Sequence, residues 1–187
     1  MYELEIIKNL ATIIATIIAS YVAITGLDAW RKQLKGKTDY ELARRYLRAI
    51  YKIRESIKEV RNPFISIEEI FIALSESGLS EEEHSNSRKS NRAVYSKRWK
   101  KVMESKNELD IELLEAEVSW GKNSTIISKD LNDLIRKLYV GIKMFLEYPE
   151  NRLDRDILYD IGEEDIFNKE VDTAIQKIEN YLKVYLK

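Results

Sequence analysis

Residues 10–27 read LATIIATIIASYVAITGL, eighteen residues without a charge in a chain whose residues are 34% charged. As an α-helix this run is about 27 Å long, close to the roughly 30 Å hydrocarbon thickness of a bilayer. A soluble helix normally carries a polar stripe, and an interfacial helix needs a charged face. The run has neither, so the sequence predicts a transmembrane helix with a juxtamembrane extension within residues 1–35.

The chain start does not fit a secretory signal peptide. Residues 1–8 read MYELEIIK, which leans acidic, and no Ala-x-Ala pair follows the apolar run. The strongly apolar residues favour insertion by about 4 kcal/mol, and the Thr, Ser and Gly residues of the run offset part of this. We therefore expect the run to remain in the mature chain as a membrane span.

Small and large side chains occupy opposite halves of this predicted helix. Alanines at 11, 15, 19 and 23 repeat at every fourth position, a spacing that lets two helix backbones approach closely in a membrane. Alanine and isoleucine are also simply common in membrane spans, but their segregation favours helix association with a second copy or with another membrane protein. The predicted association face consists of Ala11, Thr12, Ala15, Thr16, Ala19, Ser20 and Ala23.

Basic residues predict the orientation of the span. Four of them follow the apolar run closely, against Lys8 alone before it, so the positive-inside rule places the N-terminus outside and the rest in the cytoplasm. We expect a single-pass protein of the cell (inner) membrane, with anionic lipid headgroups as partners. The predicted headgroup contacts are Arg31, Lys32, Lys35, Lys37, Arg44, Arg45 and Arg48.

Residues 38–187 predict a cytoplasmic helical domain. Gly36 is expected to interrupt the first helix, and Thr38–Glu41 forms a capping box for the next, which ends before Pro63. Ser66 caps a shorter helix to about Ser75, and residues 78–91 are expected to form an exposed loop. The second helix has apolar residues at heptad spacing, namely Ala43, Tyr46, Ile50, Ile53, Ile57 and Val60.

Three further helices complete this domain. A long helix ends before Gly121 and keeps strict 4-3 spacing through Tyr95, Trp99, Val102, Lys106, Leu109, Leu113, Ala116 and Trp120. The next runs to Tyr148, and the last begins at about Glu164. The predicted fold class is therefore all-α: one N-terminal transmembrane helix followed by a four- to five-helix bundle with coiled-coil-like heptad seams.

Residues 88–101 contain seven basic residues and no acid, which is the second charge feature of the chain. They predict an anion-binding segment or, alternatively, a basic helix start that pairs with acidic neighbours. Nucleic acid is the less favoured ligand because Tyr95 and Trp99 belong to the apolar seam. The candidate anion-binding residues are Arg88, Lys89, Arg92, Lys97 and Arg98.

Little in the composition favours catalysis. The chain has no Cys and a single histidine, His84, so thiolate chemistry and multi-histidine metal sites cannot form within one chain. Acids at 108, 110, 112, 115 and 117 are more typical of a solvated helix face than of a metal site. We predict no metal, no cofactor and no enzymatic activity.

Three functions remain open from the sequence. The first is a membrane-anchored assembly, adaptor or regulatory protein that acts as an oligomer or as a subunit of a membrane complex. The second is a pore-forming or membrane-perturbing effector of the toxin or defence type, in which Thr12, Thr16 and Ser20 line the pore. The third is a membrane-tethered sensor that binds an anionic ligand or nucleic acid through its basic segments.

Overall fold

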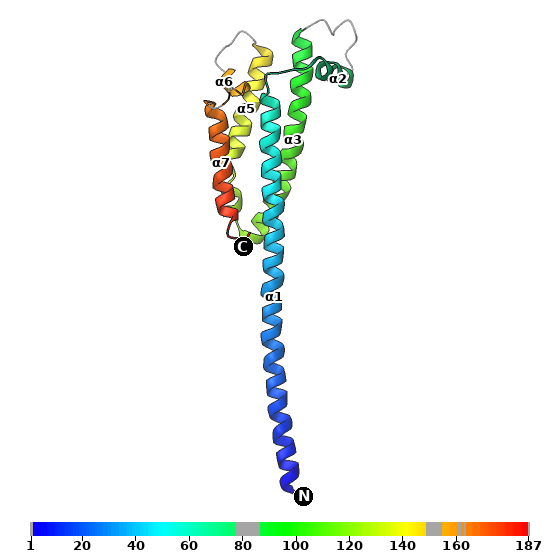
Figure 1. Cartoon of the computed structure of the whole chain (residues 1–187), viewed down its shortest axis with the longest axis vertical. Coiled ribbons are helices and arrows are strands. Elements are labelled where there is room, and N and C mark those ends of the chain that lie inside the picture. Colours follow the sequence, from blue (N-terminus) through cyan, green and yellow to red (C-terminus); the bar gives the residue numbers. More distant parts are fainter. Residues whose placement is uncertain (1, 78–86, 149–154, 161, 163, 187) are drawn as a thin grey trace. The chain divides into compact units, whose positions relative to one another are not determined.

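A computed structural model describes residues 2–77, 87–148, 155–160, 162 and 164–186. Every regular element in these ranges is a helix, and no strand occurs among them, so the predicted all-α class is confirmed. Figure 1 labels the helices, whose bounds are α1 (Tyr2–Arg61), α2 (Ile67–Ser77), α3 (Ser87–Trp120), α4 (Asn123–Ile126), α5 (Lys129–Glu147), α6 (Arg155–Leu158) and α7 (Ile166–Leu182).

The chain divides into two compact units, an N-terminal unit up to Glu41 and a C-terminal unit from Leu42 to Lys187. In the N-terminal unit every residue from 5 to 38 is exposed. Within the described ranges, α1 is the one helix long and apolar enough to cross a membrane, and none of its apolar window is buried. The prediction of a long apolar N-terminal helix is confirmed at this level.

The predicted helix break at Gly36 is wrong, because α1 runs without interruption from Tyr2 to Arg61. The Thr38 hydroxyl donates to the Leu34 carbonyl, 3.1 Å away and one turn earlier, instead of capping a new helix. A single glycine inside a helix costs only about 1 kcal/mol relative to alanine. The neighbouring residues form helix readily enough to outweigh that cost.

The core of the C-terminal unit is one hydrophobic cluster, to which α1, α3, α5 and α7 all contribute. Figure 1 shows α3, α5 and α7 alongside the last part of α1, from Leu42 to Arg61. The six apolar residues predicted from the heptad spacing of this part, Ala43 to Val60, are each at most 1% exposed. The other helices bury Val102, Leu109, Leu113, Ala116, Leu131, Ile135, Leu138, Ile142, Phe167, Val171, Ala174 and Ile178.

Local signals set three of the helix ends. The Ser66 hydroxyl accepts from the Glu69 amide at 3.1 Å before α2, and the Asp165 carboxylate accepts from the Asn168 amide at 2.8 Å before α7. Gly121 follows α3 with φ of +83°, the left-handed conformation that commonly ends a helix.

The loop predicted for residues 78–91 is wrong for residues 87–91, because α3 already begins at Ser87. The rest of that prediction, residues 78–86, lies outside the described residues, as does His84. The helix predicted to run to Tyr148 is also divided, into the short α4 and the longer α5.

Candidate functional surfaces

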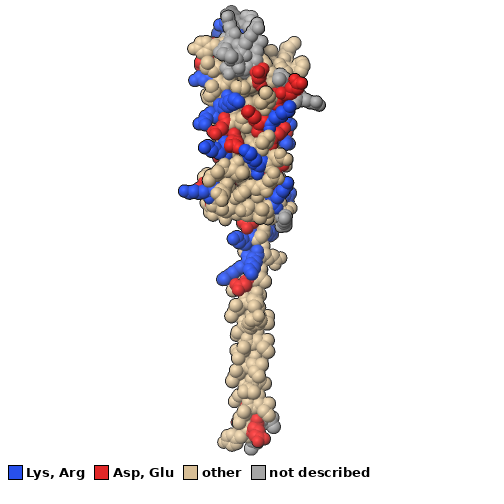
Figure 2. Space-filling model, turned by 90° about the vertical axis from the view of Figure 1, so that its left-hand side faces the viewer, with Lys and Arg blue, Asp and Glu red and all other residues tan. Residues whose placement is uncertain are grey.

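The apolar run of the N-terminal unit forms a continuous exposed surface. Figure 2 shows this part of α1 as a tan stretch without blue or red on the visible face, between an acidic start and a basic end. Large side chains of this run are exposed: the exposed fraction is 50% for Ile14, 63% for Ile17 and 69% for Tyr21. The seven residues of the predicted association face, Ala11 to Ala23, are exposed as well.

The serine and threonine hydroxyl groups within this run are satisfied by the helix itself. The Thr12 hydroxyl donates to the Lys8 carbonyl at 2.9 Å, Thr16 to Thr12 at 2.8 Å and Ser20 to Thr16 at 2.8 Å. Thr25 does the same to Tyr21 at 2.9 Å. A hydroxyl bonded to the carbonyl one turn earlier needs neither water nor a second helix. These polar atoms therefore do not require an aqueous environment.

Arg31, Lys32, Lys35 and Lys37, which follow the apolar run, are all exposed. Figure 2 shows the blue surface where the tan stretch ends. Lys37 makes a loose 4.0 Å pair with Glu41 in which both side chains are more than half exposed. The sequence predicts that these four residues contact lipid headgroups, and their exposure is compatible with that prediction.

The other three predicted headgroup contacts belong to the C-terminal unit and differ from one another. Arg45 forms a 3.1 Å ion pair with Glu112 of α3. Arg44 and Arg48 line an open groove of about 570 Å³ whose apolar wall includes Leu47. Arg45 is thus engaged within the fold, whereas Arg48 is exposed and has no partner among the described residues.

Arg98 is a buried residue of α3 whose side chain bonds α3 to α2 and to the α1–α2 connection. Its side chain is 3% exposed and donates to both carboxylate oxygens of Glu69, at 2.6 and 2.7 Å. It also donates to the carbonyls of Asn62 (2.6 Å) and Phe64 (2.7 Å), which hold the α1–α2 connection against α3. The hydrogen bond from Arg98 lowers the pKa of Glu69. With four of its five N–H donors used within the fold and its side chain buried, Arg98 is not available to an external anion.

The remaining four anion-binding candidates do not form one site. Lys97 pairs with Glu76 at 2.9 Å. Arg88, Lys89 and Arg92 line a shallow groove of about 440 Å³ together with Leu146, Glu147 and Tyr148. An anion site at this end of α3 stays a prediction, and it now rests on Arg88, Lys89 and Arg92.

A buried ion pair between Arg61 and Asp165 has no counterpart in the sequence predictions. The two side chains are 0% and 1% exposed and lie 2.7 Å apart. Arg61 also donates to the carbonyls of Ile157 (2.7 Å), Asp156 (3.0 Å) and Tyr159 (2.8 Å), and to the side chain of Asn168. Its guanidinium lies over the Phe167 ring, 4.7 Å from the centroid.

This network holds the end of α1 against α6 and the start of α7. The one sequence signal for it was a basic residue in the last turn of a helix, which is a common feature and names no partner. Since every contact is internal, the network is structural.

Tyr46 makes a smaller buried contact of the same structural kind. Its hydroxyl lies 3.2 Å from the Ser124 carbonyl and 3.3 Å from the Ser128 hydroxyl. Burial raises the pKa of Tyr46 to about 12, so the group stays protonated. It ties α1 to the segment that joins α4 and α5.

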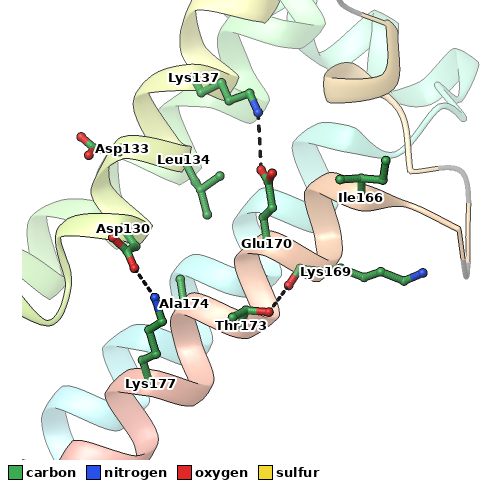
Figure 3. Close-up of a pocket in the computed structure, with 10 residues that line it drawn as sticks. All are labelled: Asp130, Asp133, Leu134, Lys137, Ile166, Lys169, Glu170, Thr173, Ala174 and Lys177. Atoms are coloured by element: carbon green, nitrogen blue, oxygen red, sulfur yellow. Dashed lines mark hydrogen bonds and ion pairs between the residues drawn. The ribbon is translucent and has the colours of Figure 1, made fainter.

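The groove between α5 and α7 has a volume of about 500 Å³ and a charged rim (Figure 3). The charges face each other across it: Asp130 pairs with Lys177 at 2.6 Å, and Lys137 with Glu170 at 3.4 Å. Its apolar lining includes Leu134 and Ala174. Asp130, Lys137, Glu170 and Lys177 are thus neutralised in pairs across the groove.

The acidic residues of α3 also lack a metal-binding arrangement. Glu108 pairs with Lys52, Glu112 with Arg45 and Asp110 with Lys106. Lys106, the one polar residue of its seam, is thereby held at the edge of the core. Among the residues that the structure describes, no cluster of three or more His, Cys, Asp or Glu side chains could hold a metal ion.

These observations define an all-helical protein with one helix that could cross a membrane and a separate helical unit held by buried arginines. No protein-family model matches the sequence, and no curated protein or solved structure matches it either.

Proposed function

We propose that the chain is a non-enzymatic, single-pass membrane protein whose C-terminal unit is a cytoplasmic helical bundle serving assembly, adaptor or regulatory roles. The observation that carries this proposal is the exposure of residues 10–27. All eighteen are exposed, whereas the C-terminal unit buries a complete apolar core of its own. An apolar surface that none of the described residues covers favours lipid as its environment.

The hydrogen bonds of this segment support the same conclusion. In hydrocarbon an unpaired polar group costs several kcal/mol, so a spanning helix must satisfy its own polar atoms. The hydroxyls of Thr12, Thr16, Ser20 and Thr25 do so within α1. The serine and threonine side chains of the span therefore need no polar partner in a bilayer.

Oligomerisation is proposed from the small side chains of the association face, Ala11 to Ala23. Close approach of two backbones is the main source of attraction between helices in lipid, and a face of Ala, Ser and Thr permits it. The partner is a second copy of the span or the span of another membrane protein. The basic residues Arg31 to Lys37 then contact anionic headgroups on the cytoplasmic side.

Membrane insertion is tested by fractionation of cells that express the full chain. We expect wild type in the membrane fraction after alkaline carbonate extraction. The double variant Ile14→Lys, Ile17→Lys should move to the soluble fraction, because two mid-span lysines together oppose insertion by about 5–7 kcal/mol. Ile111→Lys, on an exposed position of the C-terminal unit, is the matched control and should stay in the membrane. Wild type in the aqueous fraction would refute the proposal.

Association through the small face is tested by sedimentation of the full chain in mild detergent. The double variant Ala15→Leu, Ala19→Leu should weaken association at least about tenfold, because larger side chains separate the backbones. Ile14→Leu, Ile18→Leu alters the opposite half of the helix and should leave association unchanged. A strictly monomeric wild type with no co-purifying partner would contradict the assembly role.

The two alternative functions have less support. A pore needs hydroxyls that face water, and those of Thr12, Thr16 and Ser20 already donate within the helix, which leaves only their oxygen lone pairs for water. A sensor of anions needs free cations, and Arg98 and Lys97 are engaged by glutamates. Dye release from anionic liposomes at low protein load would favour the pore, and steeply salt-dependent binding to a phosphate-rich matrix would favour the sensor.

A further inference from the structure

Helix α3 has a second apolar stripe on the side away from the core. Met103, Ile111, Leu114 and Val118 are 42%, 65%, 66% and 86% exposed. At 100° per residue the four side chains lie within an arc of about 80°. The buried residues of the same stretch of α3, Val102, Leu109, Leu113 and Ala116, lie on the other side of the helix. We name Met103, Ile111, Leu114 and Val118 the outer stripe. Nothing in the part of the chain that the structure describes covers it.

The spacing of the outer stripe is that of a helix-pairing surface. Ile111, Leu114 and Val118 follow one another at intervals of three and four residues. β-branched residues at one heptad position and leucine at the other are typical of two-stranded pairing. A single helix lying along α3 would cover all three side chains at once.

Acidic side chains border the outer stripe on both sides. Glu104 and Glu115 flank it on one side and Glu117 on the other, and none of the three has a basic partner in the described ranges. The further acids Glu108, Glu112 and Asp110 are already paired with Lys52, Arg45 and Lys106. Among the α1 residues near Ile111, Arg48 is the cation left without an acid. On α3, Lys100 lies one turn before Glu104 and also has no acidic partner among the described residues. Three unpaired acids against two unpaired cations leave the border net acidic.

We propose that the outer stripe of α3 is the docking site for a basic amphipathic helix of a partner protein. Apolar side chains of that helix cover Ile111, Leu114 and Val118, while its flanking Lys or Arg side chains meet Glu104, Glu115 and Glu117. This inference rests on the proposed adaptor role and names the chemistry of the partner, but it does not depend on the membrane span.

A second copy of this chain fits the outer stripe less well. In a parallel pair of α3 helices the flanking acids of one copy would face the same acids of the other, and like charges at these positions oppose pairing. A basic helix removes that repulsion and replaces it with attraction. Charge complementarity thus selects the partner over self-association.

The test uses the full chain in non-ionic detergent and two labelled model peptides of about three heptads, which is long enough to span the stripe. Both carry Ile and Leu at the apolar heptad positions, with Lys at the flanks of one and Glu at the flanks of the other. Fluorescence anisotropy should show that the Lys peptide binds at least about tenfold more tightly, with the difference shrinking as salt is raised.

Variants locate the binding surface. Leu114→Gln should weaken binding of the Lys peptide about tenfold, because it removes the central apolar contact. Val140→Gln, at an exposed position of α5, is the matched control and should bind as wild type does. Glu104→Lys, Glu115→Lys should also weaken binding, whereas Asp172→Lys on α7 should not. All five positions are solvent-exposed, so the fold should tolerate each change.

Three results would overturn the inference. Equal binding of the two peptides would show that charge does not select the partner. Equal effects of Leu114→Gln and Val140→Gln would show that the peptide does not bind at the outer stripe. A wild-type dimer in sedimentation that Leu114→Gln dissociates and Ala15→Leu, Ala19→Leu does not would assign the stripe to a second copy. Because the peptide assay is done in detergent, its failure is separate from failure of the chain to fractionate with membranes.

Discussion

The guanidinium of Arg61 and the carboxylate of Asp165 form an ion pair from which solvent is excluded on both sides, although 104 residues separate them in the sequence. Desolvating two charges is costly, and such a pair persists only where further hydrogen bonds satisfy both groups. Here Arg61 also binds three carbonyls and Asn168, while Asp165 caps α7.

Breaking this pair should strongly destabilise the C-terminal unit. We expect Arg61→Met or Asp165→Asn alone to lower the free energy of unfolding by about 3–5 kcal/mol, because each leaves a buried charge unpaired. The double variant should lose less than the sum of the two. Arg136→Met is the control, since its pair with Asp133 is exposed and is worth at most about 1 kcal/mol. Denaturant unfolding followed by tryptophan fluorescence measures all four, and equal losses for Arg61→Met and Arg136→Met would contradict the assignment.

Glu69 should make the stability of the C-terminal unit depend on pH. Its pKa is lowered in the folded state, chiefly by the hydrogen bond from Arg98, so its contribution is complete above its ordinary pKa of 4.5. That contribution is lost as pH falls below this value. Unfolding at pH 7 and pH 3 should show a smaller pH-dependent loss for Glu69→Gln than for wild type. Arg98→Met should reduce the loss in the same way, and identical profiles in all three proteins would exclude this linkage.

The two faces of α3 should respond differently to the same substitution. Leu109 is 0% exposed, so Leu109→Ala removes buried contacts and leaves a cavity, at an expected cost of about 2–5 kcal/mol. Leu114 is 66% exposed, and Leu114→Ala should change stability by no more than about 0.5 kcal/mol. Thermal unfolding of both variants measures this difference. A large loss for Leu114→Ala would mean that the outer stripe is already covered.

Two glycines provide a matched test of the helix bounds. Gly36 lies inside α1 with open space where a Cβ would stand, so Gly36→Ala should leave the unfolding midpoint unchanged or raise it. Gly121 also has open space, but its φ of +83° disfavours any side chain. Gly121→Ala should cost about 1–2 kcal/mol and lower the midpoint by several degrees. A larger effect at Gly36 than at Gly121 would contradict the continuity of α1.

The proposed orientation can be measured directly because the chain has no cysteine. A membrane-impermeant maleimide added to intact cells should label Tyr2→Cys and leave Asp172→Cys unlabelled. After permeabilisation both variants should react. The reverse pattern in intact cells would place the C-terminal unit outside, and labelling of neither variant would show that the chain start does not reach the outer surface.

The core residues of the long helices could be predicted from the sequence, because apolar residues at 3-4 spacing lie on one face of a helix and that face becomes buried. The seams from Ala43 to Val60 and from Val102 to Ala116 are buried as the 3-4 spacing indicated. The helix stops before Pro63 and at Gly121 followed from local backbone chemistry in the same way. The predicted helix break at Gly36 was wrong, because the helix-forming residues on both sides outweigh the small cost of one glycine inside a helix.

The charged residues were harder to interpret, because the partner of a charge depends on contacts between distant segments. Arg98 was predicted to bind an anion and instead bonds Glu69 and two carbonyls beyond α1. Arg61 was not among the residues for which the sequence predicted a role. The outer stripe of α3 was not predicted, because its few apolar residues share the helix with the longer and more regular seam from Tyr95 to Trp120.

The Arg61 network also sets an order of events during synthesis. At about 5–20 residues per second, a ribosome needs roughly 5–20 seconds to advance from Arg61 to Asp165. Residues 10–27 have long since left the exit tunnel by then, while the carbonyl acceptors of that guanidinium do not yet exist. The apolar segment of residues 10–27 can therefore leave the ribosome and reach its environment before the C-terminal unit can complete its fold.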